Sequence, residues 1–187
     1  PPRSQPPENV PEQNQMDTTT QNAELPATVI REVTGLPPEL HNEKPVWEVV
    51  TAPGHRRPLT ARRVYADGRF FSFSDKRRVK GPNGLPKRVD APLAWRLDAR
   101  VNEAAVSKIR QLVAEQFATL SSSPLPVGTD ASRYPLITWR AFPGGTEHAV
   151  VTPSTAKQDE LPAVIRDIEQ AIHAGTVSEG VPIDQPQ

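Results

Sequence analysis

Apolar and polar residues alternate most clearly between positions 64 and 73, which read VYADGRFFSF. At the centre of this stretch stands Asp67-Gly68, a dipeptide that readily takes the two positive-φ positions of a type I′ turn. The pattern therefore predicts a tight β-hairpin with Asp67-Gly68 as its two-residue loop.

The loop length also predicts which residues of the hairpin face each other. With a two-residue loop, Val64 pairs with Phe71 across the hairpin. By the same count Tyr65 pairs with Phe70, and Arg62 falls on the face that carries Phe71. We therefore expect one apolar face with a basic edge.

Further segments have the composition of β-strands, because they are rich in β-branched and aromatic residues and are bounded by Gly or Pro. They are residues 27–34, 46–50 and 95–101, and the pair 136–142 and 147–152, which Pro-Gly-Gly-Thr connects. In this second hairpin Ile137, Trp139 and Ala141 share one face. Trp47 is expected to be a packing residue, since a tryptophan in a strand usually lies in the core.

Two segments show helical spacing of apolar residues. The first runs from an N-cap at Asn102 to about Leu120, and the second runs from Asp159 to Ala174, with Pro162 in its first turn and Gly175 as its stop. The apolar stripe of the first helix comprises Val106, Ile109, Leu112, Val113, Phe117 and Leu120, and that of the second comprises Leu161, Ile165, Ile168 and Ile172. Each stripe predicts a helix packed on a sheet.

This order of elements favours an α+β fold, with an antiparallel sheet of hairpins covered on one face by two amphipathic helices. We place a single domain at residues 27–175. The Pro-rich segment 1–26 and residues 176–187 are expected to be extended tails, because they hold too few apolar residues to offset the entropy of ordering. Segment 1–26 becomes ordered along a neighbouring subunit, or it is only a tether.

Residues 74–95 connect the first hairpin to the strand at 95–101, and they predict a long loop or a loosely paired excursion around Gly81-Pro82-Asn83-Gly84. A connection of this length in a small domain is often functional. It is also densely basic, so it is the part of the chain that most clearly calls for a partner.

Composition narrows the chemistry. The sequence of 187 residues has 22 prolines and no cysteine, which excludes disulfides, thiolate metal sites and a cysteine nucleophile within it. No apolar run is long enough to span a membrane.

The net charge of zero hides a segregation: residues 1–54 carry −5, residues 55–100 carry +9 and residues 101–187 carry −4. Such blocks matter for the choice of partner more than for the fold.

No motif for catalysis, nucleotide binding or metal binding is present. The four histidines are scattered along the sequence, and Asp67 and Asp130 fit turn or capping roles. We therefore expect no enzymatic activity, no cofactor and no metal site.

The basic region is the candidate partner-binding site. Its residues are Arg62, Arg63, Arg69, Lys76, Arg77, Arg78, Lys80, Lys87 and Arg88. Three interpretations stay open: a solvated loop, a contact with an acidic protein surface or anionic lipid head groups, and a contact with nucleic acid through phosphates and stacked aromatic residues.

The layout between residues 62 and 175 resembles small uncharacterised domains of bacterial cell-envelope proteins and lipoproteins. Its matching pieces are Tyr65-Ala-Asp67-Gly68-Arg69, the helix 102–120, the segment 130–134, the hairpin 136–152 and Leu161-Pro162-Ala163-Val164-Ile165. The resemblance implies an exported protein, in the periplasm or cell envelope, and supplies no catalytic residues.

Together these observations predict a non-enzymatic accessory or structural subunit of a larger, cell-envelope assembly. It would bind its partner, another subunit with an acidic surface, through the extended tail and the basic face. The alternative is a nucleic-acid-binding module that uses residues 55–100.

Overall fold

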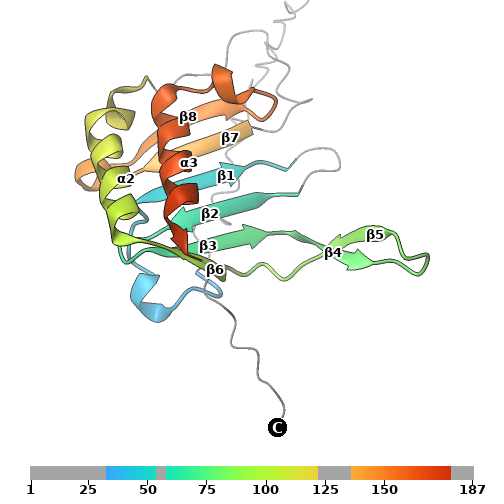
Figure 1. The fold of residues 1–187 in the computed structure, drawn as a ribbon. Helices are drawn as coiled ribbons and strands as arrows, with labels where there is room; N and C mark the ends of the chain where they lie inside the picture. Colours follow the sequence, from blue (N-terminus) through green and yellow to red (C-terminus); the bar gives the residue numbers. More distant parts are fainter. Residues whose placement is uncertain (1–32, 54–57, 122–135, 178–187) are drawn as a thin grey trace, which may run out of the picture.

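The structure is a computed structural model that describes residues 33–53, 58–121 and 136–177. It contains a seven-stranded sheet, a separate two-stranded ribbon and two α-helices (Figure 1). The strands are β1 (Trp47–Thr51), β2 (Thr60–Val64), β3 (Arg69–Ser74), β4 (Lys76–Lys80), β5 (Pro86–Asp90), β6 (Arg96–Val101), β7 (Leu136–Ala141), β8 (His148–Pro153) and β9 (Thr176–Val177), and the helices are α2 (Glu103–Glu115) and α3 (Ala163–Gly175).

The seven-stranded sheet has the order β8-β7-β1-β2-β3-β6-β9, and every neighbouring pair is antiparallel. Both helices lie on the same side of it (Figure 1). The predicted α+β class is therefore confirmed, as are the strands expected near 46–50, 95–101, 136–142 and 147–152.

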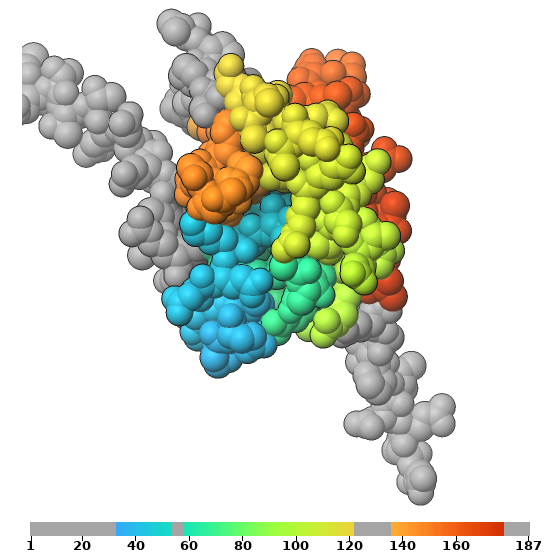
Figure 2. All heavy atoms as spheres, turned by 90° about the vertical axis from the view of Figure 1, so that its left-hand side faces the viewer, coloured from blue at the N-terminus to red at the C-terminus, as the bar shows by residue number. Residues whose placement is uncertain are grey.

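The helix side of the sheet holds the larger core. Val106, Ile109 and Phe117 from α2 and the turn after it pack with Ile165 and Ile168 of α3. The two helices touch closely, since a Cβ added to Gly175 would lie 2.3 Å from the Cβ of Ala105. Figure 2 shows the outer surface of α2 in yellow-green, with α3 in red at its edge.

The helix boundaries differ slightly from those predicted. Asn102 is the N-cap of α2, and its side chain accepts a hydrogen bond from the Ala105 N–H. The α-helix ends at Glu115, and a 3₁₀ turn at Phe117–Thr119 carries the apolar stripe onward. At the second helix, a 3₁₀ turn at Gln158–Glu160 precedes α3, and Pro162 is the N-cap.

A second core covers the opposite face of the sheet, whereas the sequence predicted cover on one face only. It contains nine buried residues: Leu36, Leu40, Val50, Leu59, Ala61, Tyr65, Phe71, Phe73 and Trp95. The segment before β1, which includes a 3₁₀ turn at Pro38–Leu40, supplies the first two of these residues. The central strands are therefore buried on both faces, and their apolar pattern is denser than strict alternation.

The predicted register of the first hairpin is wrong by one residue. Val64 pairs with Phe70 and Arg63 pairs with Phe71, because the loop has three residues, 66–68, rather than two. Gly68 takes a φ of 86°, and the Tyr65 N–H donates to the Arg69 carbonyl across the turn. This is the pattern of a turn closed by a glycine bulge.

The shift moves Arg62 to the helix side of the sheet, away from Phe71. A slip of one residue exchanges the two faces of a strand, so every side chain of β2 faces opposite to the prediction made from a two-residue loop. Arg63 is therefore the arginine that shares a face with Phe71 and Phe73.

At the C-terminal end the sheet extends beyond the predicted boundary at residue 175, because Thr176 and Val177 form β9 and pair with β6. The predicted tail 1–26 and nearly all of the predicted strand 27–34 lie outside the described residues. At residue 33, where the first described range begins, a hydrogen bond from the Leu36 N–H to the Val33 carbonyl closes a turn.

Replacement of Phe117 by alanine should lower the free energy of unfolding by about 3–5 kcal/mol, because a large buried ring would leave a cavity. The ring is fully buried and meets Trp47 edge-on, with ring centroids 4.9 Å apart. Lys108→Ala on the exposed face of α2 is the control, and it should change stability by less than about 0.5 kcal/mol. Equal midpoints of denaturant unfolding for the two variants would contradict this packing.

A matched pair of substitutions tests the bulged turn. Gly68→Ala and Gly144→Ala both place alanine at positive φ, at 86° and 60° respectively. Only at Gly68 would the new Cβ clash, 2.2 Å from the Val101 carbonyl oxygen, whereas nothing lies within 4 Å at Gly144. Gly68→Ala is therefore expected to melt at a clearly lower temperature. Similar melting temperatures would show that the turn does not abut β6.

Candidate functional site: a basic β-ribbon

The basic segment between β3 and β6 forms an antiparallel ribbon of two strands that projects away from the sheet (Figure 1). Its register pairs Lys76 with Asp90, Arg78 with Arg88 and Lys80 with Pro86. Of the two predicted forms of residues 74–95, the paired excursion is therefore confirmed.

Hydrogen bonds at its base attach the ribbon to the sheet. The Asp75 N–H donates to the Leu59 carbonyl at 3.2 Å, and the Ala91 N–H donates to the Asp75 carbonyl at 2.9 Å. The Ser74 hydroxyl donates to the Lys76 carbonyl at 2.8 Å. An isolated two-stranded hairpin is marginally stable in water, so this anchoring is what fixes the direction of the ribbon.

An ion pair between Lys76 and Asp90 also joins the two strands near the base. Its hydrogen bond holds the pKa of Asp90 below its usual range and raises the pKa of Lys76. Asp90 is the only acidic residue between 76 and 90, against six lysines and arginines. One cation at the base is therefore neutralised, and the other five cations lie between it and the tip.

Cations occupy both faces of the ribbon. Because paired residues share a face, Arg78, Lys80 and Arg88 lie on one side, and Arg77 and Lys87 lie on the other. All of these side chains are exposed. Within the described part of the chain, Arg77, Arg78, Lys80 and Lys87 form no ion pair.

Arg78 and Arg88 lie directly opposite each other across the ribbon, so the cationic side chains are close together on that face. The geometry of the ribbon thus combines closely spaced, exposed cations with a strand pair that projects from the body of the domain.

Three predicted site residues lie outside the ribbon and are already paired. Arg62 donates to Glu169 of α3 at 2.8 Å. Arg69 binds Asp67 within the turn at 2.6 Å and Glu39 at 2.8 Å, and the hydrogen bond from Arg69 lowers the pKa of Glu39. Both arginines therefore hold elements of the domain together, and neither belongs to the projecting basic surface.

Arg63, the third of these residues, is buried in the second core. Its Nε donates to Glu48 at 2.6 Å, and its guanidinium lies 4.3 Å from the centre of the Trp95 ring. Arg140 approaches the other oxygen of Glu48 at 3.4 Å, close enough for an ion pair although not aligned as a hydrogen bond. Burial also raises the pKa of the neighbouring Tyr65, an effect that the positive charge of Arg63 opposes.

Leu85, at the tip of the ribbon, is not among the site residues predicted from the sequence. Its side chain is 64% exposed, the largest value for a large hydrophobic residue in the described ranges. The available signal was a leucine placed within a run of turn-forming residues, Gly81 to Pro86, where an apolar side chain has no core to enter.

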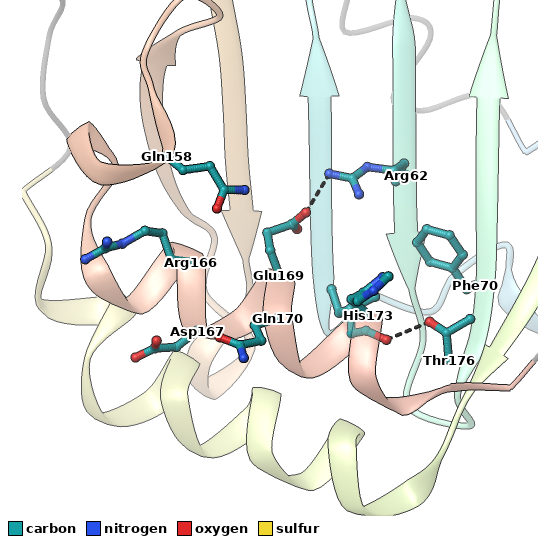
Figure 3. A pocket seen from close by; sticks show the side chains of 10 residues that line it. Arg62, Phe70, Gln158, Arg166, Asp167, Glu169, Gln170, His173 and Thr176 are labelled. Atoms are coloured by element: carbon teal, nitrogen blue, oxygen red, sulfur yellow. Dashed lines mark hydrogen bonds and ion pairs between the residues drawn. The ribbon is translucent and has the colours of Figure 1, made fainter.

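A groove of about 760 Å³ runs between α3 and strands β2 and β3. Figure 3 shows Glu169 pointing toward Arg62 across it, with His173 close to Phe70. Arg62 and Arg166 are balanced by Asp167 and Glu169, so the groove has no dominant charge. Glu169 also helps to hold α3 on the sheet, since it accepts a hydrogen bond from Trp47 Nε1 of β1 at 2.9 Å. The groove is therefore a weaker candidate than the ribbon.

The histidines do not converge in the described ranges. His41 lies 2.9 Å from the Leu36 carbonyl, His148 packs edge-on against Phe117, and His173 lines the groove, while His55 and Asp130 lie outside the described residues. No three His, Asp or Glu side chains of the described segments gather closely enough to hold a metal ion. Neither of the described helices has the length and apolar composition needed to cross a bilayer.

Arg63→Ala should lower the free energy of unfolding by about 3 kcal/mol, because Glu48 would stay buried with only the more distant Arg140 to compensate it. Arg77→Ala removes the same side chain from the ribbon and should cost less than about 0.5 kcal/mol. Urea unfolding followed by tryptophan fluorescence measures both. A neutral Arg63→Ala variant would show that the arginine is not needed inside the domain.

Comparison of the chain with protein-family models, curated proteins and solved structures finds no match. The resemblance to cell-envelope domains therefore stays a prediction, and the ribbon's charge and shape are the features that point to a partner.

Proposed function

We propose that this protein is a non-enzymatic accessory or structural subunit of a larger assembly in the cell envelope, and that the β4–β5 ribbon docks it on an acidic surface. The observation that carries the proposal is the set of exposed cations on a strand pair that leaves the body of the domain. The predicted contribution of the tail 1–26 is a separate expectation, because that segment lies outside the described residues.

Electrostatic screening favours contact through the ribbon. Five residues of extended strand span about 16 Å, which is about twice the Debye length at physiological salt. The segments before residue 55 and after residue 100 are net acidic, and they would repel an acidic partner if they lay beside the cations. A projecting ribbon presents its charge where this repulsion is largely screened.

Duplex nucleic acid is a second candidate, which the cations on both faces of the ribbon favour. A two-stranded β-ribbon fits the major groove of DNA, where both of its faces approach phosphates. Binding of this kind weakens steeply with salt, because each neutralised phosphate releases counterions.

The proposal is tested by neutralising cations on the ribbon. The double variant Arg78→Gln with Lys80→Gln should elute from a polyglutamate column at lower salt than the unchanged protein, because two exposed charges are lost. The control, Lys108→Gln with Arg110→Gln, removes the same charge from the exposed face of α2 and should elute unchanged.

A parallel column of duplex DNA separates the two candidates. Retention on polyglutamate that the ribbon variant weakens supports docking on an acidic surface. Retention confined to DNA would replace that function with the nucleic-acid candidate. Equal elution of the two double variants on both columns would overturn both.

A further inference from the structure

The tip of the ribbon is an ordered turn that presents a leucine to solvent. The Gly81 N–H donates to the Leu85 carbonyl at 2.8 Å, and the Gly84 N–H donates back to the Gly81 carbonyl at 2.9 Å. The Asn83 side chain accepts from the Leu85 N–H at 3.3 Å. These bonds tie down the backbone on both sides of Leu85, so its exposure follows from the turn itself.

Cations stand directly behind this apolar tip on both faces. Leu85 stands opposite Gly81, so Lys80 lies one residue behind it on the other strand. Lys87 lies two residues behind, and Arg78 and Arg88 lie three residues behind. At a rise of about 3.3 Å per residue, these levels lie roughly 3, 7 and 10 Å behind the leucine. The order along the ribbon is therefore apolar tip, then three levels of positive charge.

We propose that the ribbon docks tip-first on an anionic lipid bilayer, with Leu85 entering the interface and the cations binding the head-group phosphates. This inference rests on the proposed function and identifies its acidic surface as an anionic lipid bilayer. The apolar face of an interfacial helix is buried about 5–10 Å into the boundary between head groups and acyl chains, and we expect the same depth for an apolar tip. With Leu85 at that depth, Lys87, Arg78 and Arg88 meet the layer of phosphates, and the long side chain of Lys80 reaches back to it.

An end-on approach explains why both faces are basic. A ribbon that enters the interface by its tip has lipid on every side, and each nearby Lys or Arg gains attraction from an anionic leaflet. A ribbon lying on a folded protein would use one face, and the cations on the other would gain little.

The ribbon has few of the side chains that recognise the bases of nucleic acid. Between residues 76 and 90 there is no aromatic side chain on which a base could stack. The one amide side chain, Asn83, already accepts a hydrogen bond within the turn. Leu85 and the adjacent Pro86 instead form an apolar end suited to the interfacial layer of a membrane.

The test measures binding of the full-length chain to vesicles by co-sedimentation. Vesicles of equal parts phosphatidylglycerol and phosphatidylcholine should bind the protein, and vesicles of phosphatidylcholine alone should not. Leu85→Ser should weaken binding about tenfold, because a buried leucine contributes that much to transfer from water. The double variant Lys80→Gln with Lys87→Gln should weaken it about twenty-five-fold, or roughly fivefold for each cation.

Matched controls replace a leucine and two cations at positions away from the tip. Leu97→Ser alters a leucine of β6 that is 45% exposed, and Lys108→Gln with Arg110→Gln removes two charges from α2. Neither should change vesicle binding. Since the chain has no cysteine, Leu85→Cys can carry a single environment-sensitive dye. Its emission should shift to shorter wavelength on anionic vesicles, whereas a dye at Leu97→Cys should not respond.

The outcomes distinguish this inference from the function on which it rests. Unchanged binding of Leu85→Ser together with an unresponsive dye at position 85 would overturn tip-first docking. Ribbon-dependent retention on polyglutamate without any vesicle binding would also overturn it, and would leave docking on an acidic protein standing. Binding to duplex DNA, with neither retention on polyglutamate nor binding to vesicles, would overturn both in favour of nucleic acid.

Discussion

Three charged residues lie in register across the middle of the sheet, on the face away from the helices. Glu48 of β1 is the direct cross-strand partner of Arg63 in β2 and of Arg140 in β7. Burying such charges costs about as much free energy as their attraction returns, so the row adds little net stability. A one-residue slip of any of these strands would instead leave a buried charge against an apolar side chain. We infer that the row fixes the register of β7, β1 and β2.

That register decides what each face of the sheet carries. It turns Arg62 toward α3, where Glu169 accepts hydrogen bonds from both Arg62 and Trp47 and ties the helix to two strands. It turns Tyr65 and Phe71 toward the second core, where their rings meet edge-on at 5.8 Å. The helix layer and the opposite core therefore depend on one choice of strand alignment, and a slip would disrupt both.

The ribbon is the part of the described chain that this packing does not cover. β4 follows β3 after a single residue, so the ribbon inherits its direction from a buried strand while its own side chains stay in solvent. The arginines that the domain needs for itself, such as Arg62, Arg63 and Arg69, are paired with carboxylates. The ribbon instead gathers exposed cations, of which Arg77, Arg78, Lys80 and Lys87 form no ion pair within the described part of the chain. This concentration of exposed positive charge is what makes the ribbon suited to an anionic surface.

The sequence by itself determined the elements: the N-cap at Asn102, the apolar stripes of both helices and the hairpin 136–152 follow from local spacing and turn chemistry, which act between near neighbours. It also located the basic region. It could not separate Arg63, which is buried beside Glu48, from Arg77, which is exposed, because that difference depends on strand register. Register depended on one residue in the turn at 66–68, and the second core required contacts between segments far apart in sequence, such as Leu36 and Phe71. Only the tertiary structure decided these features, since burial is a property of the assembled sheet and local sequence does not specify it.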